Sequence, residues 1–167
     1  MKVLAIESTC DETAASVVES FGGGVRVLSS VVASSAKIHE KHGGVVPEVA
    51  SREQVKSIIP VITEALGEIN IKDIDAIAVS FGPGLMGSLL IGVETAKVLA
   101  WVYNKPLLKV NHVSAHLMAN WIENVPEMPA IGLVASGGHT DFVYMKSLTD
   151  WEWIGGTRDD AAGEAFD

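Results

Sequence analysis

PLLKVNHVSAH, from Pro106 to His116, joins a short apolar run to two histidines four residues apart. The run at 106–110 predicts a buried strand, and His112 and His116 then fall on one side of a helix, one turn apart. Two imidazoles in that arrangement can converge on one metal ion. The stretch therefore predicts a metal site where a strand passes into a helix, which is where open α/β sheets bind ligands. The alternative is that the two histidines only pack or form hydrogen bonds.

Apolar runs, turn residues and longer helical patterns alternate along the rest of the chain. We expect strands near 3–6, 14–18, 25–33, 74–80, 130–135, 140–145 and 151–154, and helices that begin near 49, 89, 112 and 159. Pro60 should kink or divide the first of these helices because it lacks a backbone N–H. Strands that alternate with helices predict an α/β fold.

Two polar turns follow predicted strands. Residues 7–13 (ESTCDET) and 136–139 (SGGH) each connect one strand to a strand that returns. Hydroxyls and backbone N–H groups in such a turn can surround a phosphate or its bound cation, although an ordinary hairpin has the same pattern. Because the pattern occurs twice, we expect an internal duplication, with a first lobe over residues 1–129 and the start of a second over residues 130–167.

Two further stretches are candidates for ligand or partner contact. Residues 82–88 (GPGLMGS) open a helix, where glycines and the helix N-terminus favour an anion, but a tight turn that needs small residues explains them too. This stretch is neither a Walker loop nor GxGxxG. Residues 37–48 combine lysines, histidines and a double glycine, which is typical of a solvated loop or of a contact surface for a partner or polyanion.

The composition of the 167 residues excludes several classes of protein. The chain is 48% hydrophobic and 20% charged, so it is globular. Its net charge of −9 argues against general electrostatic capture of nucleic acid or anionic membrane. A single cysteine, Cys10, allows no internal disulfide, and no apolar run reaches the roughly 20 residues of a membrane helix. We therefore expect a cytoplasmic protein without a membrane partner.

Six motifs together resemble one known family. They are IESTCDETA (6–14), HGGVVPEVASRE (42–53), GPGLMGSLLIG (82–92), NHVSAH (111–116), VASGGHT (134–140) and DDAAGEAFD (159–167). In order and approximate spacing they are similar to the tRNA threonylcarbamoyladenosine transferase family, called TsaD in bacteria and once named an O-sialoglycoprotein endopeptidase. The resemblance covers nearly the whole chain, and six motifs in one order are highly specific.

The resemblance implies a fold, a reaction and a set of site residues. The fold is the actin/hexokinase/Hsp70-like (ASKHA) fold, and the reaction moves a threonylcarbamoyl group from threonylcarbamoyl-AMP to N6 of the adenosine 3′ of the tRNA anticodon. His112 and His116 match metal ligands, usually for Fe²⁺ and sometimes for Zn²⁺. The segment that binds the adenylate, or a nucleotide like ATP or AMP, matches Val134, Ala135, Ser136, Gly137, Gly138 and Asp167. The expected partners are tRNA, a paralogous TsaB-type subunit and a TsaE-type ATPase.

Departures from the family pattern limit this assignment. The third metal ligand of the family, an aspartate far downstream, is absent from these 167 residues, so we expect the isolated chain to be incomplete for catalysis. Gln54 stands where relatives commonly carry histidine. Asp11 and Glu12 are candidates for contact with the ligand or for a general base, but neither receives a catalytic role.

Three other functions remain open from the residues alone. A zinc peptidase is disfavoured because Val113 replaces the glutamate of HExxH. A non-catalytic scaffold of the same fold would lack the histidine pair. A sugar or acetate kinase shares the fold and its polar turns, but it has no need of HxxxH.

Overall fold

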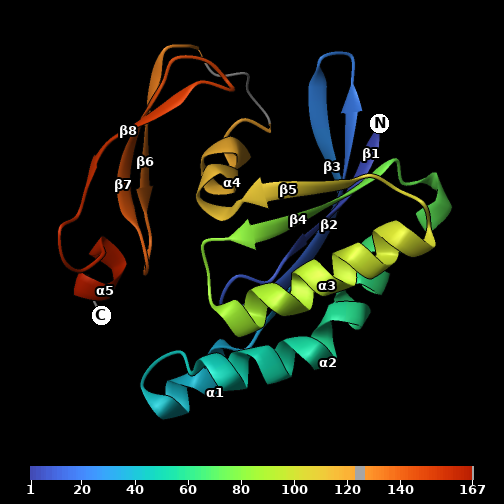
Figure 1. Ribbon diagram of the computed structural model, residues 1–167, viewed down its shortest axis with the longest axis horizontal. Coiled ribbons are helices and arrows are strands. Elements are labelled where there is room, and N and C mark those ends of the chain that lie inside the picture. Colours follow the sequence, from blue (N-terminus) through green and yellow to red (C-terminus); the bar gives the residue numbers. More distant parts are fainter. Residues whose placement is uncertain (123–126, 167) are drawn as a thin grey trace. The chain divides into compact units, whose positions relative to one another are not determined.

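A computed structural model of the chain describes residues 1–122 and 127–166 (Figure 1). The chain divides into two compact units, Met1–His112 and Val113–Asp167. Within the described residues, no helix is long and apolar enough to cross a membrane.

The first unit is built on a five-stranded sheet in the order β3-β2-β1-β4-β5. The strands are β1 (Lys2–Glu7), β2 (Glu12–Phe21), β3 (Gly24–Ser34), β4 (Ala76–Gly82) and β5 (Leu107–Asn111). β1, β2 and β3 pair antiparallel, whereas β4 runs parallel to both β1 and β5. The carboxyl ends of β1, β4 and β5 therefore meet at one end of the sheet, which brings Glu7, Gly82 and Asn111 to the same region.

Helices cover this sheet, and side chains of the helices and of the sheet together form the hydrophobic core. They are α1 (Ala36–His39), η1 (Glu40–His42), α2 (Pro47–Leu66), η2 (Ile71–Asp73) and α3 (Met86–Val102). α2 contacts β2, β3 and α3, and α3 also contacts β4 (Figure 1). Leu4 of β1 lies opposite Val17 of β2, and both are fully buried in the core with Ile62 of α2 and Ala96 of α3. Burial of each large aliphatic side chain contributes roughly 1.5–3 kcal/mol.

Several details differ from the sequence expectations. α2 continues through Pro60 without division, while a kink there stays a prediction; this proline is exposed, so solvent can satisfy the carbonyl that loses its donor. β5 is an edge strand whose Leu107 and Leu108 are exposed, not a buried strand. The helical spacing also predicts an apolar face that includes Val55, Ile58 and Ile59; Ile58 is buried as expected, whereas Val55 and Ile59 are exposed.

The second unit holds a three-stranded antiparallel sheet in the order β6-β7-β8. Its strands are β6 (Ala130–Ala135), β7 (Thr140–Met145) and β8 (Trp151–Gly156), and α5 (Ala162–Phe166) follows them. α4 (His112–Ala119) starts at the last residue of the first unit. Leu117 of α4 packs with Val134, Val143 and Met145, and Gly132 leaves room for it: a Cβ there would lie 2.7 Å from Leu117 Cδ2.

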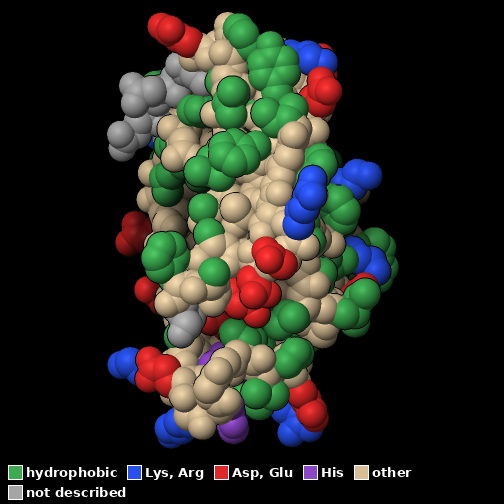
Figure 2. All heavy atoms as spheres, turned by 90° about the vertical axis from the view of Figure 1, so that its left-hand side faces the viewer, with side chains coloured by type: hydrophobic (Ala, Val, Ile, Leu, Met, Phe, Trp, Pro, Cys, Tyr) green, Lys and Arg blue, Asp and Glu red, His purple; other side chains and the backbone are tan. Residues whose placement is uncertain are grey.

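The second sheet also exposes large hydrophobic side chains. Ile131, Leu133, Phe142, Trp153 and Ile154 are all exposed. Figure 2 shows hydrophobic side chains beside acidic ones on one face of the protein. Both sheets contain three consecutive antiparallel strands, β1-β2-β3 and β6-β7-β8, which agrees with a duplication. The lobe boundary at residues 129 and 130 stays a prediction.

Candidate functional site

The two histidines of the HxxxH motif lie where the sequence places them. β5 ends at Asn111 and α4 begins at the next residue, so His112 and His116 are one helical turn apart on the same element. His112 therefore sits at the carboxyl end of the parallel strands, next to the ends of β1 and β4. This position confirms the expected passage from strand to helix, while the role of the histidines as metal ligands stays a prediction.

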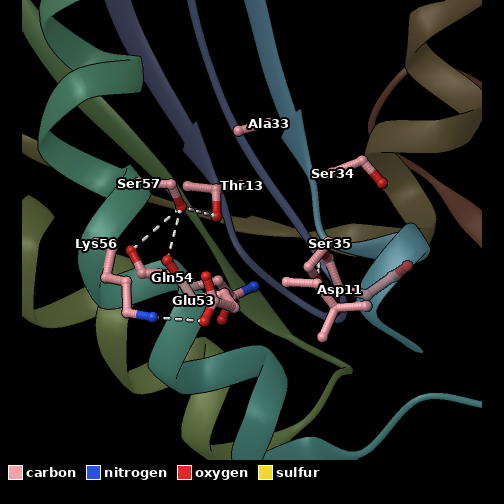
Figure 3. Close-up of a pocket in the computed structure, with 10 residues that line it drawn as sticks. Asp11, Thr13, Ala33, Ser34, Ser35, Glu53, Gln54, Lys56 and Ser57 are labelled. Atoms are coloured by element: carbon pink, nitrogen blue, oxygen red, sulfur yellow. Dashed lines mark hydrogen bonds and ion pairs between the residues drawn. The ribbon is translucent and has the colours of Figure 1, made fainter. Parts of the chain in front are cut away.

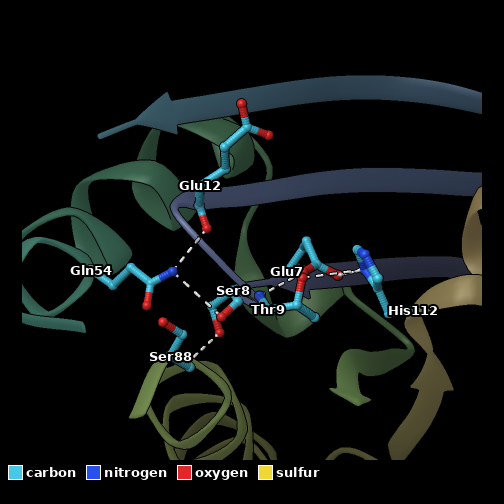
Figure 4. A network of polar contacts seen from close by, with 7 residues as sticks. All are labelled: Glu7, Ser8, Thr9, Glu12, Gln54, Ser88 and His112. Atoms are coloured by element: carbon cyan, nitrogen blue, oxygen red, sulfur yellow. Dashed lines mark hydrogen bonds and ion pairs between the residues drawn. The ribbon is translucent and has the colours of Figure 1, made fainter. Parts of the chain in front are cut away.

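His112 contacts the last residue of β1 and the residue two positions beyond it. Its Nδ1 atom lies 3.3 Å from Glu7 Oε2 and 3.3 Å from Thr9 Oγ1 (Figure 4). Glu7 Oε1 accepts a hydrogen bond of 2.7 Å from the backbone N–H of Thr9. Burial by itself raises the pKa of Glu7, but hydrogen bonds from His112, Ser80 and Thr9 outweigh it and lower the pKa to about 2. Glu7 is therefore an anion beside the imidazole at any physiological pH.

Donors from other elements occupy the carbonyl groups of the β1–β2 turn. Gln54 of α2 is 1% exposed, and its Nε2 donates to the carbonyls of Ser8 and Glu12 at 3.4 and 3.0 Å (Figure 4). It also donates to the carbonyl of Cys10 at 3.0 Å. Ser88 Oγ also donates to the Cys10 carbonyl at 3.0 Å. One amide that faces three carbonyl oxygens has its orientation fixed, since its own oxygen would be repelled there. Gln54 therefore clamps the turn onto α2.

The hydroxyls of this turn are also committed to the interior. Ser8 is fully buried and donates to the carbonyl of Ser88 at 2.8 Å, and Thr13 bonds Ser57 at 2.9 Å. These contacts favour the hairpin interpretation of residues 7–13 over a phosphate cradle formed by the same hydroxyls. The turn acts as a support for Glu7 and Thr9.

The glycines of GPGLMGSLLIG make close approach to this turn possible. The backbone N–H of Leu85 donates to the Thr9 carbonyl at 2.7 Å, and a Cβ at Gly84 would lie 2.6 Å from that same oxygen. A Cβ at Gly92 would collide with the hydroxyl of Ser8. These contacts explain the small residues by packing, which is the second of the two interpretations that the sequence left open.

Asp11 and Glu12 occupy different places although they are adjacent in sequence. Asp11 lines a pocket of about 180 Å³ with Ser35, Glu53 and Lys56, in which Lys56 Nζ bonds Glu53 Oε1 at 2.6 Å (Figure 3). Glu12 is exposed at the first position of β2. Their candidacy as a general base stays a prediction.

Cys10 lies in the same turn, directly before Asp11 and Glu12 in sequence. Burial first, and then the negative charge of Asp11, raise the pKa of the Cys10 thiol to about 11. The cysteine is therefore a neutral thiol at physiological pH and a poor nucleophile.

The second polar turn connects β6 to β7 and is more open. Val134 and Ala135 end β6, and Ser136 closes the turn by accepting from the backbone N–H of His139 at 3.1 Å. Gly137 and Gly138 are exposed, and a Cβ on either would meet nothing within 4 Å. The predicted adenylate segment thus presents an accessible backbone. Asp167, the remaining predicted contact, lies outside the described residues.

The first two residues of α5 contact this second turn. The backbone N–H of Gly163 donates to the Ser136 carbonyl at 3.1 Å, and a Cβ at Gly163 would lie 2.7 Å from the Gly137 nitrogen. Ala162 N–H donates to Thr140 Oγ1 at 2.7 Å. The VASGGHT and DDAAGEAFD motifs, separate in sequence, are therefore neighbours in the fold.

The described residues contain no cluster of three or more His, Cys, Asp or Glu side chains that could hold a metal ion.

The family model for tRNA N6-adenosine threonylcarbamoyltransferase matches residues 26–167. The chain belongs to that family. This membership confirms the resemblance seen in the six motifs.

Curated relatives in the tRNA N6-adenosine threonylcarbamoyltransferase family are about half identical to the chain. The protein of that name from Persephonella marina is 52% identical over 169 residues, which are 100% of this chain and 48% of the relative. The one from Staphylococcus aureus strain Newman is 53% identical over 167 residues, 99% of this chain and 48% of the relative. The chain thus spans about half the length of the curated relatives it matches.

Solved structures of other proteins share the fold of this chain. YeaZ from Pseudomonas aeruginosa superposes with a TM-score of 0.58 at 16% identity, covering 93% of this chain and 66% of YeaZ. The Ppx/GppA enzyme of Aquifex aeolicus gives a TM-score of 0.53 at 11% identity, covering 92% of this chain and 52% of that protein. The chain therefore has the ASKHA fold that the sequence predicted.

Sequence reasoning missed several residues that support the site. Glu7, Thr9 and Ser88 make the contacts that fix the first turn and His112, and Gln54 was noted only as a departure from the family. All four lie within or next to the quoted motifs, but no spacing rule joins residues about 100 positions apart, such as Glu7 and His112.

Proposed function

We propose that the chain is part of an acyltransferase of tRNA modification. The complete protein would transfer the threonylcarbamoyl group from threonylcarbamoyl-AMP to N6 of the adenosine 3′ of the anticodon. The single observation that carries the proposal is the family match over residues 26–167. The relatives of about 52% identity carry that activity in their names, and this chain retains both histidines of the motif.

The donors on α4 fit part of a divalent metal site. His112 and His116 are imidazoles at i and i+4, and imidazole suits both iron and zinc. The contact of Nδ1 of His112 with Glu7 is the kind of outer carboxylate contact that metal-bound histidines usually make. A metal bound by these histidines would supply Lewis-acid polarisation of the threonylcarbamoyl group. We propose Fe²⁺ as the resident ion and Zn²⁺ as its substitute.

The open turn between β6 and β7 is proposed to receive the adenylate. Gly137 and Gly138, which follow Ser136, are exposed, and backbone N–H groups in such a turn can bind anionic oxygens. Ala135 is exposed and would contact the nucleotide, whereas the buried Val134 would take part through its backbone. Asp167 is proposed to accept from the ribose or base. With the mixed anhydride held there, adenosine N6 can attack the acyl carbon directly. The bond from that carbon to the phosphate oxygen breaks, AMP leaves and N6 loses a proton to water, so no side-chain nucleophile is needed.

The charges of the chain bear on its proposed macromolecular partners. Residues 61–167 hold six basic against fourteen acidic residues, which disfavours tRNA binding by this part. The basic side chains at 37–56 are partly neutralised, because Arg52 bonds Glu48 and Lys56 bonds Glu53. We propose that tRNA is steered mainly by the rest of the protein or by its TsaB-type and TsaE-type partners in the cytoplasm.

The test is transfer by the full-length protein that carries this sequence. Synthetic threonylcarbamoyl-AMP with a labelled threonine carbon, tRNA and the partner subunits should yield label in tRNA, and His112→Ala/His116→Ala should abolish it. Glu19→Gln, a half-buried position on β2 whose ion pair is with Arg26, is the matched control and should leave transfer unchanged. No labelled tRNA from the full-length protein, with or without partners, would contradict the proposal.

A further inference from the structure

One ring nitrogen of His112 faces two oxygen atoms at the end of β1. Nδ1 lies 3.3 Å from Glu7 Oε2 and equally far from Thr9 Oγ1, while the other carboxylate oxygen of Glu7 is held by Thr9 N–H at 2.7 Å (Figure 4). The Glu7 side chain is 31% exposed and that of His112 is 21% exposed. The carboxylate is therefore anchored in a partly desolvated place and cannot turn away from the ring without losing its backbone contact.

This environment decides which nitrogen carries the proton in a neutral ring. An ionised carboxylate only accepts hydrogen bonds, so a lone pair on Nδ1 would be repelled by it. The Thr9 hydroxyl could donate to such a lone pair, but the adjacent charge would still oppose that tautomer. A proton on Nδ1 satisfies the carboxylate and lets the hydroxyl act as a second acceptor.

We propose that Glu7 is a positioning residue, which fixes His112 with its proton on Nδ1 so that Nε2 is the nitrogen that meets a metal ion. This inference rests on the metal site of the proposed function and adds the residue that prepares it. Metal-ligating histidines generally donate their other N–H to such a partner, and removal of the partner weakens metal binding about 10–100-fold. β1 thus contributes to the site through the residue that ends it.

The first test needs neither a metal nor a variant. Long-range ¹H–¹⁵N correlation spectra of the metal-free chain report which ring nitrogen of each histidine carries the proton. His112→Ala identifies the signals of His112. We expect the proton of His112 on Nδ1 and no proton on Nε2. A proton on Nε2 of His112 would overturn the proposal.

The second test measures Zn²⁺ affinity by titration calorimetry. Glu7→Gln keeps the shape of the side chain but removes its charge, and it should weaken Zn²⁺ binding about 10–100-fold and mix the tautomers of His112. Thr9→Val keeps the carboxylate of Glu7 and should leave the proton of His112 on Nδ1. Glu19→Gln should change neither readout.

The outcomes separate this inference from the proposed function. Unchanged Zn²⁺ affinity in folded Glu7→Gln overturns the positioning role while the metal site stands. If the wild-type chain and the full-length protein both bind no Zn²⁺, the metal site of the proposed function fails together with the role of Glu7 in it. Circular dichroism of each variant establishes that it is folded.

Discussion

The two hairpins of this protein share the pattern of strand, polar turn and returning strand, but their surroundings differ. The turn after β1 is held by Gln54, Leu85 and Ser88, and its Ser8 is fully buried. The turn after β6 keeps Gly137 and Gly138 exposed, and it is held by its own Ser136 and by Gly163. A polar turn can therefore serve as a rigid support or as an open contact surface. The neighbouring elements, more than the turn itself, decide which.

Gly84→Ala should show the largest difference between the two turns. Its Cβ would lie 2.6 Å from the Thr9 carbonyl, a backbone atom that cannot move freely. Overpacking of this kind should lower the free energy of unfolding of the first unit by up to about 3 kcal/mol. Urea denaturation followed by circular dichroism measures the loss. A variant as stable as the wild type would show that the first turn is not tightly held.

The alkylation rate of Cys10 in the first turn can be compared with that of a cysteine introduced into the second turn. Its pKa is raised from 9.0 to about 11, so its thiolate fraction near neutral pH, and with it alkylation by iodoacetamide, should be about 100-fold below that of an ordinary thiol. The rate should keep rising until the pH approaches about 11. Gly138→Cys in a Cys10→Ser background places a thiol on the open turn and should react at the ordinary rate. Equal rates for the two thiols at neutral pH would contradict the difference.

Gln54→Leu removes the amide that bonds three carbonyls of the first turn. Buried carbonyls left without a donor should cost about 1–3 kcal/mol of unfolding free energy. Gln54→Glu sharpens the test, because a carboxylate beside three carbonyl oxygens is repelled and should be at least as unstable. Thermal unfolding of both variants measures the effect. A stable Gln54→Glu would mean that the amide does not clamp the turn.

Gly137→Ala is the smallest expected change. A Cβ there would meet no atom within 4 Å, so stability should change by less than about 0.5 kcal/mol. The accessible backbone of this turn nevertheless makes it a probe of ligand contact, and AMP affinity can be measured on the same variant. A large loss of stability would show that the second turn is as tightly packed as the first.

Much of the fold was predictable from local patterns. Apolar runs bounded by glycine or polar residues marked every strand, and the six motifs identified the family and its fold. Local patterns failed where tertiary context decides: Pro60 is tolerated because it faces solvent, and Leu107 is exposed because β5 lies at the sheet edge. Residues 37–48 were expected to form a loop or contact surface, but their first part lies in α1 and η1, where His39 is buried.

The candidate site was predictable only in part. The i and i+4 spacing located His112 and His116 on one helix because that geometry is local. The partner Glu7 could not be found in this way, because parallel pairing of β1, β4 and β5 brings it to His112 from 105 positions away. Gln54 was visible as an unusual residue, but its three acceptors appear only after the turn has folded.

Metal content tests the central claim, that the α4 histidines form a metal site supported by the first turn. The chain and the full-length protein, each purified beside its His112→Ala/His116→Ala variant, are analysed for iron and zinc by mass spectrometry. We predict about one divalent ion per full-length protein, weaker retention by the chain, and loss of the ion from both double variants. Equal metal content with and without the two histidines would contradict the claim.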